Sequence, residues 1–237
     1  MKHLVVVALA LFTACKKTEK ADSSSAAKST EDKAGKSGKP GAAPAGPFGA
    51  WDMPARQAAF QGAHVAPGSA LGMWEAWEVA GDKVTTWDGK TEKKLEFKLI
   101  SPCEVKITEK SDGGSSSTTH HYTLLDGKIV TGLGNAGSRK GPEAVACVSN
   151  AIFTVDAKGT CTEWSPPMFD DGKYEQKPGT CGFKKDGDKE VFVATANGSE
   201  STLEVHGDAL LSQQLAGSHS EKVADFAAAK AARETKK

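Results

Sequence analysis

Three glycines have the spacing of a cofactor-binding motif. The run GLGNAG matches the dinucleotide-binding pattern G-x-G-x-x-G through Gly132, Gly134 and Gly137. That pattern needs a preceding strand, which KIVT fits, and a helix that begins at the last glycine. Here Gly141 and Pro142 interrupt any helix within its first turns, and the chain then becomes β-prone. We therefore predict no dinucleotide but a crossing loop between antiparallel strands, with Arg139 and Lys140 at a basic tip.

Adjacent histidines and clustered aspartates are the other groups that attract attention as metal ligands. His120 and His121 are neighbours on a β-prone run, so their side chains point to opposite faces and do not share one ion. We interpret them as surface or core histidines. The aspartates at 170–171 and 186–188 lack the full calcium-loop pattern and indicate turns. Catalytic patterns such as G-x-S-x-G are absent, so we expect no metal ion, no cofactor and no enzymatic activity.

The start of the chain has the composition of an export signal. Lys2 and His3 precede an unbroken apolar run over residues 4–12. That run is too short to cross a bilayer, which takes about 20 apolar residues, and it fits the apolar region of a secretory signal peptide. We therefore expect a signal peptide over residues 1–14.

The end of this segment, LFTAC, resembles the lipobox of bacterial lipoproteins. The resemblance implies cleavage after Ala14 and a diacylglyceryl group on Cys15. Phe12 stands where that family usually has leucine, and Lys16 implies sorting to the outer rather than the inner membrane. Each buried CH₂ of an acyl chain such as palmitate contributes about 0.8 kcal/mol. The expected partner is thus the membrane of the cell envelope, bound through the N-terminal lipid.

Residues 15–48 differ in composition from the rest of the chain. Lys, Ser, Ala, Gly and Pro dominate this stretch, and large apolar residues are nearly missing before Phe48. Such a segment cannot bury enough surface to offset its ordering entropy, so we expect a disordered tether that carries the lipidated cysteine. The rest, about 185 residues, is long enough for one domain with a proper core. A formal net charge of +0 gives no indication of nucleic acid as a partner.

Five cysteines make an even set once Cys15 is assigned to the lipid. In an exported protein the remaining four predict two disulfide bonds. The four are Cys103, Cys147, Cys161 and Cys181. Three pairings are open, and we favour Cys161 with Cys181 and Cys103 with Cys147. No two of these cysteines have the C-x₂₋₄-C spacing of a structural zinc site.

Short β-prone runs follow one another through the folded part, separated by pairs such as Asp-Gly and Asn-Gly that favour tight hairpin turns. In KLEFKLI, residues 94–100, apolar side chains alternate with charged ones, and CEVKIT, residues 103–108, places Glu104 and Lys106 opposite its apolar residues. Alternation with one solvated face is typical of antiparallel sheets. The predicted fold is all-β, an antiparallel meander forming a small barrel or sandwich over residues 49–217.

Two helices are expected beside this sheet. DMPARQAAFQ, residues 52–61, offers Asp52 as the N-cap and Pro54 in the first turn. At the other end, Ser218 and Glu221 have the spacing of a capping box. We therefore predict a C-terminal amphipathic helix over residues 218–237.

The order of an opening helix followed by hairpins resembles small lipocalin-like or calycin-type barrels over about 130 residues. The resemblance implies a small apolar ligand, although Gly62-Ala63-His64 has histidine where that family carries tryptophan. The long loop over residues 162–180 carries large apolar side chains that either line a ligand mouth or plug one end of the barrel. The candidate ligand-binding residues are Trp74, Trp77, Trp87, Trp164, Phe169 and Tyr174.

The sequence thus supports two classes of function. The first is a lipid-anchored envelope protein whose disulfide-stapled β domain binds a small apolar ligand or an envelope partner. The second is a structural or assembly lipoprotein that acts through protein–protein contact, without a ligand cavity. An enzyme is the third hypothesis and the least supported, because no catalytic constellation is evident.

Overall fold

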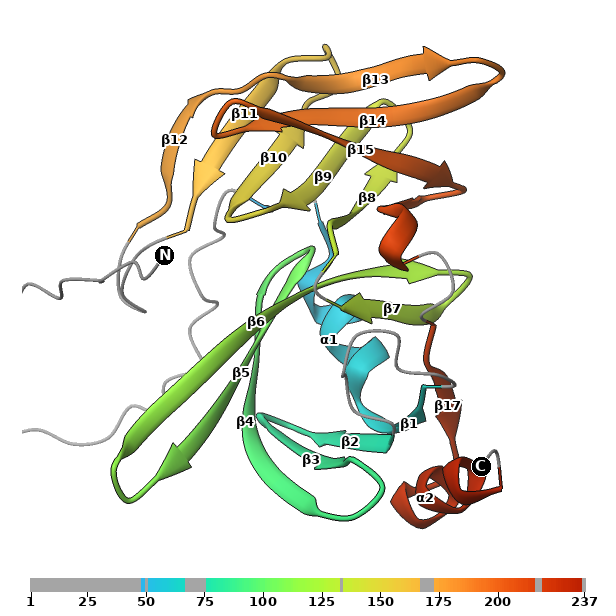
Figure 1. The fold of residues 1–237 in the computed structure, drawn as a ribbon. Helices are drawn as coiled ribbons and strands as arrows, with labels where there is room; N and C mark the ends of the chain where they lie inside the picture. Colours follow the sequence, from blue (N-terminus) through green and yellow to red (C-terminus); the bar gives the residue numbers. More distant parts are fainter. Residues whose placement is uncertain are drawn as a thin grey trace, which may run out of the picture. The chain divides into compact units, whose positions relative to one another are not determined.

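The computed structural model describes most of the chain after the expected tether, and these residues belong to one compact unit, Ala43–Lys237. The described ranges are 48–49, 51–66, 76–132, 134–166, 173–215 and 219–235. Two antiparallel sheets and two α-helices make up this part of the chain (Figure 1). The predicted all-β antiparallel class is confirmed.

The first sheet has eight strands in the order β17-β1-β2-β3-β4-β5-β6-β7 and forms a nearly closed barrel. Its last closure comes from the C-terminal part of the chain. Ser220 donates its backbone N–H to the carbonyl of Ile129 over 2.7 Å, and Val130 pairs with His219 in an isolated bridge. The strands are β1 (Gly62–Val65), β2 (Ala76–Ala80), β3 (Lys83–Trp87), β4 (Glu92–Ser101), β5 (Glu104–Ser111), β6 (Gly114–Leu125), β7 (Lys128–Gly132) and β17 (Glu221–Val223).

Helix α1 (Met53–Phe60) lies within the curve of this barrel (Figure 1). As predicted, the Asp52 carboxylate caps it, accepting the Ala55 backbone N–H over 2.9 Å, and a proline occupies the first turn. The helix delivers Phe60, which is 2 % exposed, into the barrel core. The apolar faces predicted for β4 and β5 line the same core, so the period-two interpretation of these strands is confirmed. The core residues are Phe60, Trp77, Val79, Val84, Leu95, Phe97, Val105, Ile107, Tyr122 and Ile129.

The second sheet has nine strands in the order β12-β11-β10-β9-β8-β16-β15-β14-β13 and is curved as a half-barrel. Its two outermost strands, β12 and β13, are consecutive in the chain, and the disulfide between Cys161 and Cys181 joins β11 to β13. The strands are β8 (Ala136–Lys140), β9 (Glu143–Val148), β10 (Ala151–Val155), β11 (Cys161–Ser165), β12 (Glu175–Pro178), β13 (Cys181–Asp186), β14 (Lys189–Ala196), β15 (Ser199–His206) and β16 (Ala209–Leu211).

In the sequence, the strands of the nine-stranded sheet are inserted between the first seven strands of the barrel and its last strand. Strands β1 to β7 build most of the barrel, β8 to β16 then form the whole nine-stranded sheet, and β17 returns to the barrel. A 3₁₀ turn, η1 (Gln213–Leu215), lies on the return path. The first and the last strand of the described chain, β1 and β17, therefore both belong to the eight-stranded sheet.

The two sheets are packed against each other through β6, which contacts β8 and β16. The disulfide between Cys103 of the barrel and Cys147 of β9 joins them covalently, and both cysteines are fully buried. Around it lie Val145 and Ile152, whose neighbours in sequence point to the opposite face and fill the half-barrel core. Strands β9 and β10 are therefore buried on both faces. Both favoured disulfide pairings are confirmed.

The GLGNAG segment is not a crossing loop throughout, so this prediction is wrong in its second half. Gly137 belongs to β8, which pairs with β9 on one side and β16 on the other. Arg139 does not lie at a tip either, because it is on the same strand and contacts Glu190 over 2.5 Å. The short polar stretch AGSRK reads as a loop by composition, yet strands on both sides supply its backbone hydrogen-bond partners.

The C-terminal helix is shorter than predicted. Helix α2 (Phe226–Glu234) begins after Asp225, whose carboxylate accepts the Ala228 N–H over 2.8 Å. Glu221 lies in β17 and Ser218 lies outside the described residues, so a helix over 218–237 is wrong at its start. Barrel closure outweighs the local capping pattern here, because β17 gains a ladder with β1. The apolar face of α2 packs on the outside of β1 and β2.

The predicted boundary at residue 48 also moves. Phe48, assigned to the end of the tether, is 6 % exposed and packs into the cluster around the inter-sheet disulfide. Two of the predicted hairpin turns show the expected geometry, because Asp126 and Asn197 and the glycines that follow them all have positive φ angles. The pair Asn197-Gly198 thus forms the turn between β14 and β15.

Candidate functional site

The predicted ligand-binding aromatics do not converge on one place. Trp77 lies inside the barrel, whereas Trp87 lies in the cluster that α2 covers on the outside. Trp164 and Tyr174 pack between the sheets near the Cys103–Cys147 disulfide. The other two predicted ligand-binding residues, Trp74 and Phe169, lie outside the described part of the chain. The same is true of Cys15, the residue expected to carry the lipid.

The barrel interior is filled by the protein's own side chains. The ring of Phe60 contacts those of Trp77, Phe97 and Tyr122, with ring centroids 6.0, 5.2 and 4.9 Å apart. The space left among them is a cavity of about 10 Å³, whereas pockets for small ligands measure about 300–1,000 Å³. The cavity among these core side chains is therefore too small for a small apolar ligand.

The prediction of one long loop over residues 162–180 is wrong at both ends, because these pair with each other as β11 and β12. The aromatic residues described in this range pack into the seam between the sheets. Trp164 donates its indole N–H to the hydroxyl of Thr154 over 2.8 Å, and the Tyr174 hydroxyl donates to the carbonyl of Ile100 over 3.4 Å. The ring of Phe48 meets that of Tyr174 edge-on at 5.3 Å. These aromatic side chains contact one another and other residues of the chain. Such packing favours the interpretation that they fill space within the protein over the interpretation that they line the entrance to a ligand site.

An inter-sheet cleft of about 590 Å³ lies among the described residues. We use the name for the space between the N-terminal end of α1, the β6–β7 hairpin, β8 and the β15–β16 turn. Its lining combines charged residues of both signs with apolar surface. The lining residues are Trp51, Asp52, Ala55, Arg56, Leu124, Leu125, Asp126, Gly127, Ser138, Arg139, Lys140, His206 and Asp208.

The arginines of the inter-sheet cleft are held in place, while its rim is exposed. Arg56 donates to the carbonyl of Pro102 over 2.8 Å and lies over the ring of Trp51 at 5.6 Å. Asp126 and Asp208 are exposed at the hairpin turns that border the cleft. The cleft thus combines a cation and an aromatic ring that contact each other with exposed carboxylates at its border, an arrangement suited to a polar partner.

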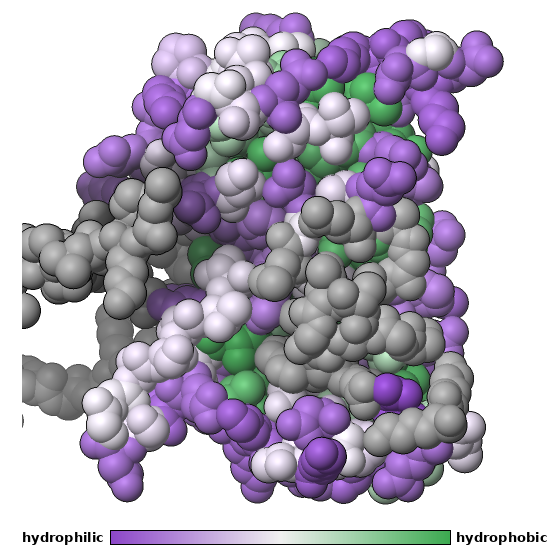
Figure 2. Space-filling view, viewed as in Figure 1, coloured by the Kyte–Doolittle hydropathy of each residue, from purple (hydrophilic) through white to green (hydrophobic). Residues whose placement is uncertain are grey.

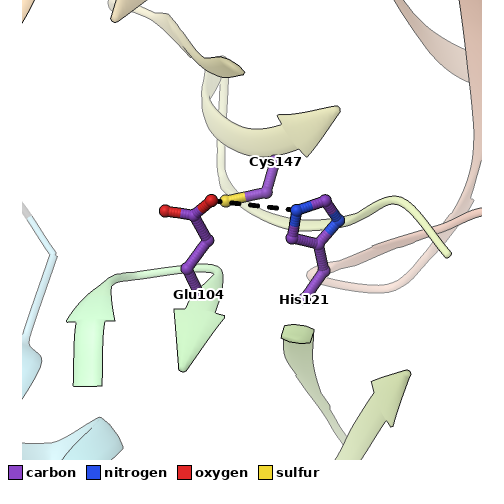
Figure 3. A group of neighbouring side chains, drawn as sticks. All are labelled: Glu104, His121 and Cys147. Atoms are coloured by element: carbon purple, nitrogen blue, oxygen red, sulfur yellow. Dashed lines mark ion pairs between the residues drawn. The ribbon is translucent and has the colours of Figure 1, made fainter. Parts of the chain in front are cut away.

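A buried polar cluster between the sheets is the second candidate site (Figure 3). Glu104 of β5 and His121 of β6 are directly paired across the strands, and Glu104 Oε1 lies 3.8 Å from His121 Nε2. One ligand atom each from these two residues and Cys147 lie within 4.8 Å of one another. His120, one residue earlier, lines the small cavity inside the barrel. The two histidines thus take opposite faces, as predicted, and both are buried.

Burial changes the acid–base behaviour of this cluster. Glu104 is 4 % exposed, and burial raises the pKa of its carboxyl to about 7, although the Ser101 hydroxyl, 3.5 Å from Oε2, acts in the opposite direction. Burial lowers the pKa of His121, while the carbonyl of Gly134, 3.2 Å from Nδ1, partly offsets this. A neutral imidazole with Nδ1–H donating to Gly134 therefore points its Nε2 lone pair into the cluster.

We expect Glu104→Gln to remove a pH-dependent loss of stability. The carboxyl ionises near 4.5 in the unfolded chain and near 7 in the folded one, so the unfolded state releases its proton first and folding becomes less favourable as pH rises between these values. A difference of about 2.5 units corresponds to about 3 kcal/mol. Relative to wild type, the variant should gain that amount between pH 4.5 and pH 8 in urea denaturation. The control is Glu109→Gln on the exposed end of β5, and a pH-independent difference between wild type and Glu104→Gln would contradict the expectation.

Sequence reasoning missed Glu104 because it assigned that residue to a solvated face. The alternation in CEVKIT correctly separated the two faces of β5, but the second sheet covers the outer face at this end of the strand. The neighbouring Cys103 was the available signal, because a cysteine bonded to a distant strand implies that another layer lies close to it.

Comparisons with protein-family models, with curated proteins and with solved structures find no match for this chain. The barrel-like architecture is compatible with the lipocalin-like resemblance at the level of fold class. Within the described residues, no helix has both the length and the apolar character needed to span a bilayer.

Proposed function

We propose that this chain is a lipid-anchored protein of the bacterial cell envelope whose β domain acts by binding an envelope protein. The observation that carries the proposal is the packing of the aromatic rings in the barrel core, because the cavity among them measures only about 10 Å³ and is too small for an apolar ligand. Protein–protein contact, the second of the functions considered from sequence, therefore becomes the first.

The inter-sheet cleft is the contact surface in this proposal. Pockets for small molecules are mostly apolar with a few polar groups, whereas the lining here combines apolar surface with charged residues of both signs, among them Arg56, Asp126 and Asp208. Tryptophan and arginine often dominate the energetics of protein interfaces, and Trp51 with Arg56 offers that combination at the floor of the cleft. Exposed Asp126 and Asp208 add charges at the rim that select the partner by complementarity.

Photocrosslinking in intact cells tests the contact surface. A photoreactive residue in place of Asp126 or Asp208 should trap one envelope protein, whereas the same residue in place of Asp188, exposed on the β13–β14 turn away from the cleft lining, should not. The purified partner should then bind the Asp126→Lys, Asp208→Lys variant about tenfold more weakly. Equal trapping at Asp188, or quenching of tryptophan fluorescence by an apolar ligand without any crosslink, would favour other functions.

The membrane attachment rests on the sequence LFTAC and on the tether composition of residues 15–48. Cys15→Ser removes the only group that could carry the lipid in the lipobox reading, so the variant should move from the membrane to the soluble fraction on cell fractionation. Radioactive palmitate should label the wild type alone. The control is Cys161→Ala together with Cys181→Ala, which leaves Cys15 intact, and a Cys15→Ser chain that stays with the membrane would contradict lipid anchoring.

A further inference from the structure

The buried cluster between the sheets contains four groups that bind metal ions when they are in the right protonation and oxidation state. They are the Cys103 and Cys147 sulfurs, the His121 imidazole and the Glu104 carboxyl. Two sulfurs, one nitrogen and one oxygen make a tetrahedral ligand set that suits Zn²⁺. In the folded chain the two sulfurs are joined to each other, so the disulfide occupies the sulfur half of this set.

The positions of the groups fit such a site. Glu104, His121 and Cys147 each place one ligand atom within 4.8 Å of the others, and a zinc ion bound to sulfur at about 2.3 Å and to nitrogen at about 2.0 Å brings these atoms about 3.5 Å apart. The Cys103 sulfur is bonded to that of Cys147 and therefore lies next to this group. Zinc binding therefore requires the Glu104, His121 and Cys147 ligand atoms to approach one another by about 1 Å, and the two sulfurs to separate once they are reduced.

The surroundings of His121 resemble the support that zinc-binding histidines receive. Its Nδ1 is 3.2 Å from the carbonyl of Gly134, and a histidine that ligates a metal usually donates its other ring N–H to such a carbonyl. This contact leaves Nε2 directed at Glu104, 3.8 Å away. The orientation that zinc requires is thus already present.

Glu104 gives the second, independent indication of a ligand. Its side chain is buried, with only 4 % of the residue exposed. The polar groups nearest to its carboxyl oxygens are the Ser101 hydroxyl at 3.5 Å and the His121 imidazole at 3.8 Å, and both distances are long for a buried carboxyl. Buried charges are normally paired or bound to a metal. The carboxyl therefore lies among neutral groups in a place where a cation would satisfy it.

We propose that the chain with reduced Cys103 and Cys147 binds one Zn²⁺ through these two thiolates, His121 Nε2 and the Glu104 carboxylate, and that disulfide formation replaces the metal. Cys147 comes from the nine-stranded sheet and the other three ligands from the barrel. The metal therefore holds the two sheets together in the reduced chain, as the disulfide does in the oxidised one.

The chemistry balances without a reductant in a newly made chain, whose cysteines are still thiols. Zinc binding forms two Zn–S bonds and releases the two thiol protons, and it also releases the Glu104 proton from chains in which that carboxyl is protonated; the neutral imidazole adds without proton loss. An oxidising protein disulfide then accepts two electrons from the thiolates, becomes a dithiol with two protons from water, and leaves the Cys103–Cys147 bond and free Zn²⁺. A dithiol reductant reverses this step and is itself oxidised to a disulfide.

Cobalt titration of the full-length chain tests the site. The background carries Cys15→Ser, Cys161→Ala and Cys181→Ala so that the two thiols of interest are the only ones left, and it is prepared reduced and oxidised. The reduced form should bind one Co²⁺ with the thiolate charge-transfer absorption and intense visible bands of a tetrahedral site, and Zn²⁺ should displace it. Zn²⁺ should also slow alkylation of Cys103 and Cys147.

Two substitutions and one control locate the ligands. His121→Ala and Glu104→Gln should each weaken zinc binding more than about 100-fold, because even the loss of an outer-shell partner costs about 10–100-fold. His206→Ala, on a half-exposed histidine of β15, should leave the affinity unchanged. The proposal is overturned if the oxidised form binds equally well, if His121→Ala retains the cobalt spectrum, or if the reduced chain binds no metal, whether folded or unfolded by circular dichroism.

Discussion

Replacing Phe60 with alanine is expected to lower the free energy of unfolding by about 3–5 kcal/mol. The side chain is almost completely buried and contacts three aromatic rings from β2, β4 and β6 at the centre of the barrel. The surrounding strands are tied into a nearly closed sheet, so they cannot collapse into the space that the ring leaves. Loss of transfer energy and the cost of the new cavity therefore add.

Urea denaturation followed by circular dichroism measures this effect, and Phe226→Ala is the matched control. Phe226 begins α2 on the outside of the barrel and is only partly buried, so its loss should cost less than half as much. Equal losses for the two variants would mean that Phe60 does not fill the barrel. The proposed function would then lose its main support, because an unfilled barrel has room for a ligand.

Gly137→Ala is expected to cost at least about 3 kcal/mol, at or above the upper end of the usual range for overpacked sites. A Cβ atom at this position would lie 2.4 Å from the carbonyl oxygen of Val145 and 2.8 Å from the Cα of Ala146. Both are backbone atoms of β9, so no side-chain rotation relieves the contact. Strands β8 and β9 must move apart, although β8 is held on its other side by β16.

Gly182→Ala is the control for this second substitution. Gly182 also lies in a strand of the nine-stranded sheet, β13, and a Cβ built there meets nothing within 4 Å. Its replacement should change stability by about 0.5 kcal/mol or less. If thermal unfolding shifts equally for both alanine variants, the close approach of β8 and β9 is not as described.

The strands that the sequence predicted share one property, an apolar face supplied by their own residues. KLEFKLI and CEVKIT show it, and they lie in β4 and at the start of β5. The strands that were missed are short or polar, such as β8 with AGSRK and β12 with EQKP. Their pairing partners hold them in place, and partners distant in the chain leave no periodic pattern to detect.

The division into two sheets was not predictable from period alone. Strand β9 is buried on both faces because one face lines the half-barrel core and the other meets the barrel. A continuous apolar run such as AVACV indicates such a strand but does not say which layer covers it. The same limit explains the candidate ligand residues: the sequence shows where tryptophans occur, but not that Trp77 and Trp87 face opposite sides of one barrel.

The exposed part of the β5–β6 ribbon shows what sheet pairing alone can hold. Residues 109–119 are exposed on both faces, and Figure 2 shows this projecting region in hydrophilic and neutral colours. Without a core beneath it, a two-stranded ribbon of this kind is marginally stable in water. The β-propensity of its residues and the turn at its tip therefore determine whether this ribbon is ordered, and both features are visible in the sequence.

Because the nine-stranded sheet is inserted in the sequence between the strands of the barrel, the order of synthesis determines which sheet can be completed first. A ribosome makes residues 62–132 first, and these lay out seven of the eight barrel strands. The seam opposite stays open until residues 219–223 have been made, because only they bridge β7 to β1. The intervening strands can meanwhile pair among themselves, since each has its neighbours within residues 136–211. The nine-stranded sheet can therefore be complete before the barrel is. Residues 219–223 then close the barrel.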